Sequence, residues 1–149
     1  MQLQEFINKA REKREKRIKV AQIEIKDIGL VEFQRPVEKD FVAYMNKING
    51  SSRTIIEHLG KNEEGEDLKR EIQEPEDMGM ILKASTEFVY KTCSFFRAKE
   101  LRDEVTDGNY FSIPSLFLET TEIMDLASKI MDKFEIQEEK AKDEEDLKN

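Results

Sequence analysis

The sequence predicts a mostly helical α+β fold, in which a small N-terminal β-hairpin packs on a bundle of helices. Two observations carry this prediction. Apolar residues recur every three or four positions within residues 75–134, which is the spacing of one helix face. They alternate with polar residues between Ile23 and Phe33, which is the spacing of a β-strand. The predicted organisation is a basic, helical or flexible arm at residues 1–16, one domain at residues 17–134 and an acidic tail at residues 135–149.

Basic residues dominate the start of the chain. Residues 9–19 contain seven lysines and arginines against two glutamates. Glu12 and Glu15 each precede a lysine by four residues, which is the spacing of stabilising ion pairs on an exposed helix. The same charge can meet the phosphates of a nucleic acid, an anionic partner protein or the acidic tail of a neighbouring copy. We expect a solvated helix and keep a small nucleic-acid-associated regulator as an alternative function.

A β-hairpin is predicted next, at residues 23–33. Its two alternating segments flank residues 27–29, where a glycine favours a turn. Ile18 and Val20 are out of phase with this alternation, so we expect a bulge or a strand start near Ala21. Because a lone hairpin is marginally stable in water, its edge is a candidate assembly surface.

A helix is predicted from Pro36, which ends the second strand, through Ile48. Phe41, Met45 and Ile48 stand at helical spacing and are expected on its core side, with Tyr44 at the margin. The helix therefore packs one apolar face against the hairpin or the later helices.

The middle of the chain, residues 49–74, is expected to be an acidic surface excursion. It has few apolar residues, and short helices are expected at residues 54–59 and 66–72. Its acids lack the alternating oxygen ligands and the closing glutamate of a helix-loop-helix calcium site. We therefore interpret them as a solvated acidic loop.

Two long antiparallel helices, joined through a third short one, are predicted in the second half. The first opens at Pro75 and carries the apolar stripe of residues 78–92. A turn is expected at residues 106–109, which contain glycine and short polar side chains. The second helix opens at Ser112 with Pro114 in its first turn, where a missing N–H costs nothing. Its stripe comprises Leu116, Ile123, Ala127, Ile130 and Phe134.

Counting reactive residues argues against an enzyme, a metal site or a bound cofactor. His58 is the only histidine and Cys93 the only cysteine, and neither phosphate-binding glycine loop occurs. Cys93 stands in an apolar helical context, where a buried small hydrophobe is the expected role. The sequence also has no leader and no run of about 18 apolar residues, so we expect a cytoplasmic protein without a membrane partner.

Methionine and phenylalanine exceed the needs of a small two-faced core. Flexible thioethers and aromatic rings suit a groove that holds the amphipathic helix of a partner. The candidate client-binding residues are Met80, Phe95, Phe96, Phe111, Phe117 and Met124.

The second half of the chain resembles the XkdN-like tail assembly chaperones of tailed bacteriophages and phage-derived tail particles. The family reads roughly L-x-x-A-S-T-x-x-Y, then a D/K-x-K-E-L-x-D link, then a helix started by proline. The residues at matching positions are Ala84, Ser85, Thr86, Ala98, Lys99, Glu100, Leu101, Asp103 and Pro114, followed by the stripe that ends at Phe134. Leu82 and Tyr90 each stand one position after the leucine and the tyrosine of the pattern. Residues 50–74 have no counterpart in this pattern.

The resemblance implies a non-enzymatic chaperone for phage tail assembly. Its implied client is the tape measure protein, or another helical tail protein, whose apolar stripe would be covered until tube subunits displace the chaperone. Homo-oligomers are compatible with this function, and nucleic acid is the disfavoured partner. A structural subunit of the same tail particle is the other alternative.

Overall fold

The computed structural model describes residues 1–52 and 54–148, with side chains for residues 1–52 and 54–134. The predicted acidic tail, residues 135–149, therefore lies outside the described side chains. The chain is α+β and mostly helical, which confirms the predicted fold class. The elements are α1 (Leu3–Glu15), β1 (Val20–Ile25), β2 (Gly29–Gln34), α2 (Glu38–Asn49), β3 (Thr54–Lys61), β4 (Asp67–Gln73), α3 (Met78–Thr92), α4 (Lys99–Arg102), the 3-10 helix η1 (Tyr110–Ser112), α5 (Pro114–Phe117) and α6 (Thr120–Lys148).

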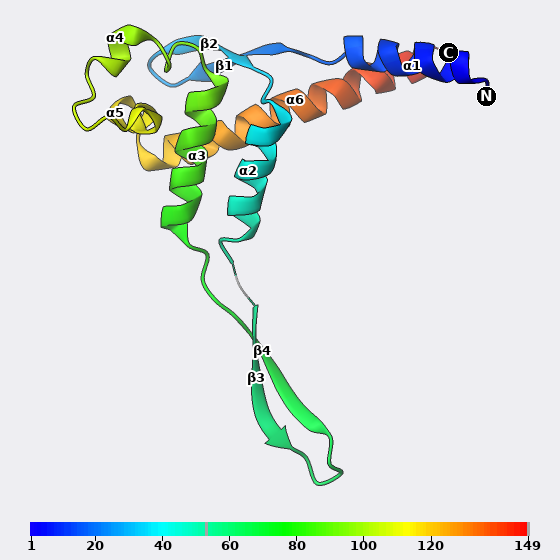
Figure 1. Cartoon of the computed structure of the whole chain (residues 1–149), viewed down its shortest axis with the longest axis vertical. Coiled ribbons are helices and arrows are strands. Elements are labelled where there is room, and N and C mark those ends of the chain that lie inside the picture. Colours follow the sequence, from blue (N-terminus) through cyan, green and yellow to red (C-terminus); the bar gives the residue numbers. More distant parts are fainter. Residues whose placement is uncertain (53, 149) are drawn as a thin grey trace.

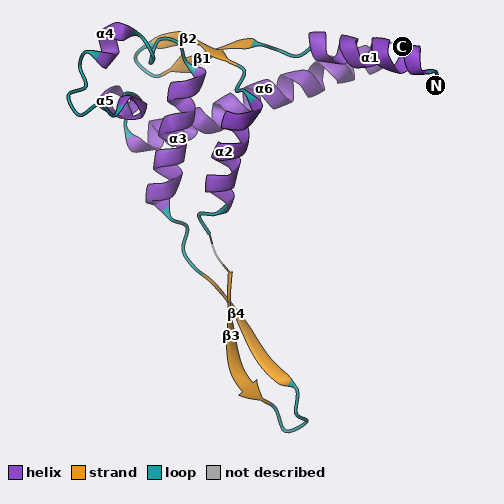
Figure 2. Cartoon of the chain, viewed as in Figure 1, coloured by secondary structure: helices purple, strands orange, loops and turns teal. Residues whose placement is uncertain are grey.

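Helix α3 organises the body of the molecule. It contacts α2, α6, η1 and α5, and β1 contacts α6 (Figure 1). Figure 2 shows the two hairpins at different places: β1–β2 lies at the top of the body, and β3–β4 extends below it. We use "body" for all elements except α1 and the β3–β4 hairpin.

The first hairpin is confirmed. Strands β1 and β2 pair antiparallel in continuous register from Val20 with Gln34 to Ile25 with Gly29. The strand starts at Val20 without a bulge, because Ala21 begins the buried alternation and Val20 faces solvent. The turn places Asp27 and Gly29 at positive φ, a conformation that glycine adopts without strain.

Apolar residues from the sheet and the helices form one core. Phe33, Phe88, Ile113, Ile123 and Ile130 are among its largest fully buried side chains. The predicted stripes of the two long helices are confirmed from Ser85 to Thr92 and from Ile123 to Phe134. Tyr44 contributes more than predicted, because its ring stacks on Phe88 at 4.4 Å between ring centroids. Phe41, Met45 and Ile48 are only half-buried.

Both predicted helix starts need correction. Helix α3 begins at Met78 rather than Pro75, because Asp77 is its N-cap and accepts a hydrogen bond from the Met80 N–H at 3.1 Å. The second long helix is broken: α5 has Pro114 in its first turn, and Leu118 is then extended (φ −119°, ψ 146°) before α6. The break lets Leu118 enter the core and leaves Leu116 exposed.

The middle segment is a second β-hairpin, so the predicted short helices at residues 54–59 and 66–72 are wrong. β-Branched residues Thr54, Ile55 and Ile56 favour a strand, and Ile55 pairs with Ile72 across the hairpin. Asn62 closes the turn, since its side-chain oxygen accepts from the N–H groups of residues 64 and 66. Gly65 supplies the positive φ that follows such a turn.

The second hairpin joins the body at a narrow root. The Asp77 N–H donates to the Ser51 carbonyl at 2.8 Å, and the Ser51 hydroxyl donates to the Ile48 carbonyl at 2.6 Å. The whole chain exposes a surface of 11460 Å². A compact protein of this mass would expose about 7,900 Å².

Candidate protein-binding site

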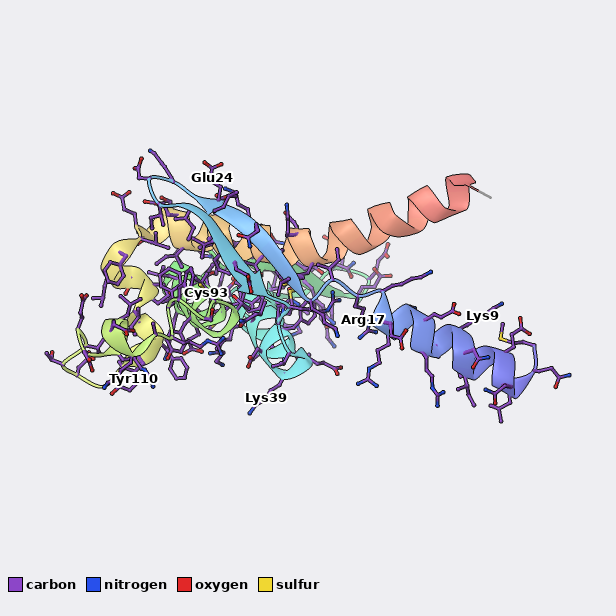
Figure 3. All side chains as sticks on the ribbon, turned by 90° about the horizontal axis from the view of Figure 1, so that it is seen from above. Lys9, Arg17, Glu24, Lys39, Cys93 and Tyr110 are labelled. Carbon is purple, nitrogen blue, oxygen red and sulfur yellow. The ribbon has the colours of Figure 1, made fainter. Side chains whose placement is uncertain are left out.

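Four large apolar side chains are exposed within one short segment of the body. Tyr110 and Phe111 of η1 and Leu116 and Phe117 of α5 are between 42% and 54% exposed. We call these four side chains the aromatic surface. Figure 3 shows Tyr110 at the edge of the molecule, far from Lys9 on α1. Large exposed apolar side chains so close together in the sequence are a candidate protein-binding site.

The aromatic surface is held in place from beneath. Ile113 and Pro114, between its two halves, are buried, so η1 and α5 are anchored to the core. The Phe111 ring meets the Tyr90 ring edge to face at 5.4 Å between centroids. The Lys91 ammonium lies 5.5 Å from the centre of the Phe111 ring, within reach of a cation–π attraction. A partner would therefore meet rings of fixed orientation.

The structure brings together only some of the predicted client-binding residues. Phe111 and Phe117 belong to the aromatic surface. Phe95 is 64% exposed and follows the end of α3, the same end that Phe111 packs against. Met124 is half-buried in α6. Met80 is exposed, but it lies in the first turn of α3, about 15 Å along the helix from Tyr90.

Phe96 corrects the prediction. Only 7% of this residue is exposed, and it belongs to the core cluster, so it cannot contact a partner. Its neighbour Phe95 points outward because the chain turns after α3, where the Arg97 N–H donates to the Ser94 carbonyl. Two adjacent phenylalanines without a helix or strand period give no sign of which one faces the core.

Tyr110 and Leu116 are functional candidates that sequence reasoning missed. The apolar spacing predicts Leu116 on the core stripe of one continuous helix, but the break at Leu118 shifts that stripe. The sequence sign of this break was the pair Ile113 and Pro114. Two adjacent residues cannot anchor a long amphipathic stripe, but they can fix a single helical turn.

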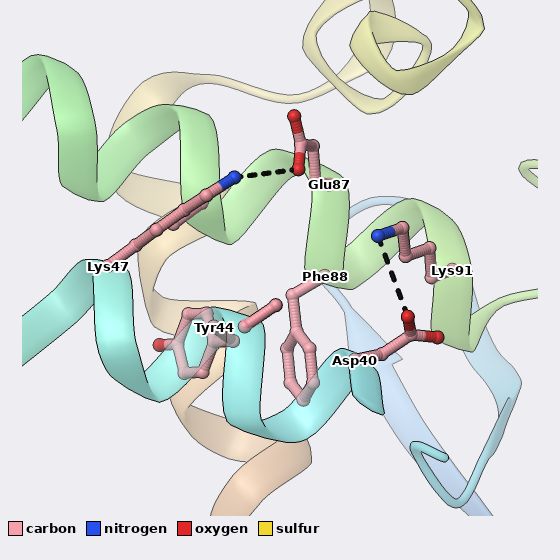
Figure 4. A pocket seen from close by; sticks show the side chains of 8 residues that line it. Asp40, Tyr44, Lys47, Glu87, Phe88 and Lys91 are labelled. Atoms are coloured by element: carbon pink, nitrogen blue, oxygen red, sulfur yellow. Dashed lines mark hydrogen bonds and ion pairs between the residues drawn. The ribbon is translucent and has the colours of Figure 1, made fainter. Parts of the chain in front are cut away.

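The seam between α2 and α3 contains a small cavity (Figure 4). Its volume is about 10 Å³, the space of one water molecule. Ion pairs cross the seam on either side of the stacked rings, from Lys47 to Glu87 at 3.1 Å and from Lys91 to Asp40 at 3.5 Å. Burial raises the pKa of the Tyr44 hydroxyl in this seam, whereas the nearby Ser85 hydroxyl opposes the rise.

His58 and Cys93, the single histidine and the single cysteine of the sequence, are far apart. His58 is exposed on β3, beyond the first turn of α3, whereas Cys93 follows the last turn and is fully buried. Burial raises the pKa of the Cys93 thiol, which suits a core position. Within residues 1–52 and 54–134, no three metal-binding side chains gather.

No described helix combines the length and the apolar composition needed to span a bilayer. Comparison of the chain with protein-family models, with curated proteins and with solved structures finds no match.

Proposed function

We propose that this protein is a non-enzymatic chaperone that binds an apolar-striped helix of a client protein during phage tail assembly in the host cytoplasm. The aromatic surface carries the proposal, because it exposes four apolar side chains on anchored helices of the body. The second half of the chain resembles the XkdN-like tail assembly chaperones, and this resemblance implies that the client is the tape measure protein. Its long helix would otherwise aggregate through its apolar stripe.

The mechanism follows from the chemistry of the aromatic surface. Phe111, Leu116 and Phe117 present rings and a branched chain that cover the apolar stripe of an amphipathic helix. Two cations border the surface, since Lys91 lies over the Phe111 ring and Arg102 lies 6.0 Å from the centre of the Tyr110 ring. They fit acidic residues at the margin of a client stripe. The net charge of −8 keeps the complex soluble by repulsion between copies.

Co-expression with the tape measure protein of the same tail gene cluster tests the proposal. The wild-type chain is expected to keep the client soluble and to co-purify with it. Phe111→Glu and Phe117→Glu should each lower recovery at least about tenfold, because a charge would enter an apolar contact. Circular dichroism should show unchanged folding, since both side chains are nearly half exposed.

Leu30→Glu is the matched control. Leu30 is an exposed apolar residue on β2, outside the aromatic surface, so this variant should recover the client as the wild type does. Equal recovery by all variants would contradict the proposed surface. An insoluble client in the presence of the wild-type chain would contradict the chaperone function itself.

A nucleic-acid-associated regulator is the second candidate. It is favoured by α1, which has no buried residue and presents its basic side chains to solvent, as Lys9 shows in Figure 3. Binding of duplex DNA that weakens steeply between low and moderate salt, and is lost when Arg11 and Arg14 become glutamine, would favour it over the chaperone. A structural tail subunit would instead remain in finished particles.

A further inference from the structure

Helix α1 has an apolar face that nothing in the described chain covers. Leu3, Phe6, Ile7 and Ala10 stand at helical spacing on one side, and no residue of α1 is buried. Arg14 continues this side four residues after Ala10. Arg11 and Lys13 flank it, and the three glutamates of α1 lie on the opposite side. The uncovered face is therefore apolar at its N-terminal end and basic at its C-terminal end.

The β3–β4 hairpin has an uncovered apolar face too. Ile55, Leu68 and Ile72 lie on one side, because cross-strand partners and alternate residues of a strand share a face. Leu59 stands beside them, in the bulge between His58 and Gly60 and next to the partner of Leu68. These four side chains are between 37% and 53% exposed. Within the face, Glu57 and Arg70 form a salt bridge. Beyond it, the turn between the strands carries Glu63, Glu64 and Glu66.

The two faces match in charge and in length. The apolar part of the hairpin face leads toward an acidic tip, whereas the apolar part of the α1 face leads toward basic residues. Leu3 to Ala10 covers about 10 Å of helix, and Ile55 to Leu59 covers about 13 Å of strand. A two-stranded hairpin needs a helix or a further strand on its apolar face to be stable in water. Helix α1 has an uncovered apolar side that can pack on this face of the hairpin.

In the structure, α1 and the β3–β4 hairpin of one chain lie far apart (Figure 1). Helix α1 is tied to the body close to its own end, since Arg35 donates to the carbonyls of Ile18 at 3.2 Å and Lys19 at 2.7 Å. The hairpin root lies beyond the far end of α2, about 18 Å away along that helix. The hairpin itself extends further still from the body (Figure 1). With the elements in this arrangement, a helix that covers the hairpin comes from another molecule.

We propose that this chain self-associates head to tail, with α1 of one copy docked on the β3–β4 hairpin of the next. The apolar side of α1 covers Ile55, Leu59, Leu68 and Ile72, and its basic end lies against the acidic tip. The contact is heterologous, so it either closes into a ring or extends into a filament. The proposal stands independently of the aromatic surface, which remains uncovered in such an assembly.

Sedimentation velocity of the full chain tests the proposal over a roughly 100-fold range of concentration, at low and high salt. The wild type is expected to associate more as concentration rises and less at high salt, because charges take part in the contact. Phe6→Glu on α1 and Leu68→Glu on β4 should each weaken association at least about tenfold. Leu30→Glu should associate as the wild type does.

Mixing the two variants gives the decisive result. Phe6→Glu keeps an intact hairpin face and Leu68→Glu keeps an intact helix face, so the mixture should form two-chain complexes and nothing longer. Normal association of either variant alone would show helix–helix or hairpin–hairpin contacts and overturn the proposal. So would a mixture that stays monomeric. A wild-type chain that is monomeric at every concentration would also overturn it.

Discussion

Ser85 is a buried polar residue whose hydroxyl makes no hydrogen bond among the described side chains. It lies close enough to Tyr44 to influence the pKa of the phenol, yet no hydrogen bond of normal geometry joins the two hydroxyls. Burying a hydroxyl without a partner costs free energy. By contrast, the buried Thr92 hydroxyl donates to the Phe88 carbonyl at 2.8 Å.

Ser85→Ala should raise the free energy of unfolding by about 1 kcal/mol, because it removes the unpaired hydroxyl and favours the helix. Thr92→Val is the matched change at a satisfied site, and it should lower the free energy of unfolding by about 1 kcal/mol. Urea unfolding followed by circular dichroism measures both. A loss of stability in Ser85→Ala would mean that Ser85 bonds to Tyr44 in solution.

Cys93 should react slowly with iodoacetamide while the chain is folded. The thiol is fully buried and its pKa is raised, so little thiolate exists near pH 8. Because the folded-state pKa lies above the unfolded one, the stability due to this difference is present at neutral pH. It falls as the pH rises through the ordinary thiol pKa, about 8.5. Mass spectrometry of alkylated protein, with and without urea, measures the protection. Equal rates would contradict it.

Elements with a clear hydrophobic period were predictable from the sequence. The β1–β2 hairpin and the stripes of α3 and α6 follow directly from alternation or from three- and four-residue spacing. The β3–β4 hairpin was not, because its apolar residues cover no core and its acidic turn reads as a loop. Its sign was the β-branched run at residues 54–56 together with Asn62 and Gly65 in the turn.

The N-cap of α3 should contribute measurably to stability. Asp77→Ala removes the acceptor of the Met80 N–H and should lower the free energy of unfolding by about 1 kcal/mol. Asp77→Asn keeps a side-chain oxygen of the same shape and should retain most of that stability. Chemical denaturation compares the three proteins. Equal losses in the two variants would assign the effect to charge rather than capping.

The candidate binding site was predictable only in part, because the exposure of its residues depends on helix breaks. Phe111 and Phe117 are exposed as expected, whereas Phe96 is buried and Leu116 leaves the core stripe. Burial at these positions is decided by the turn after α3 and by the extended Leu118. Both are tertiary outcomes that no local period encodes.

In the whole molecule, the β3–β4 hairpin is a projecting arm, and we expect the body to fold without it. No residue of β3 or β4 is buried, and the root is closed by the bond from Asp77 to Ser51. Replacing residues 53–75 with two glycines should change the melting temperature of the body by only a few degrees.

Small-angle scattering should show the largest dimension of that variant shortened by roughly 20 Å. The reason is that β3 alone, eight residues long, extends about 26 Å. The measurement belongs at low concentration, where copies are separate. An unfolded variant would show that the arm supports the body. An unchanged dimension would show that the arm folds back in solution.

The closed root has a further consequence for protein engineering. The chain leaves the body after α2 and returns to it before α3 at nearly the same point. The intervening sequence can therefore vary in length without moving either helix. The site between Ser51 and Asp77 is thus suited to accept a foreign domain whose own termini lie close together, such as a fluorescent reporter.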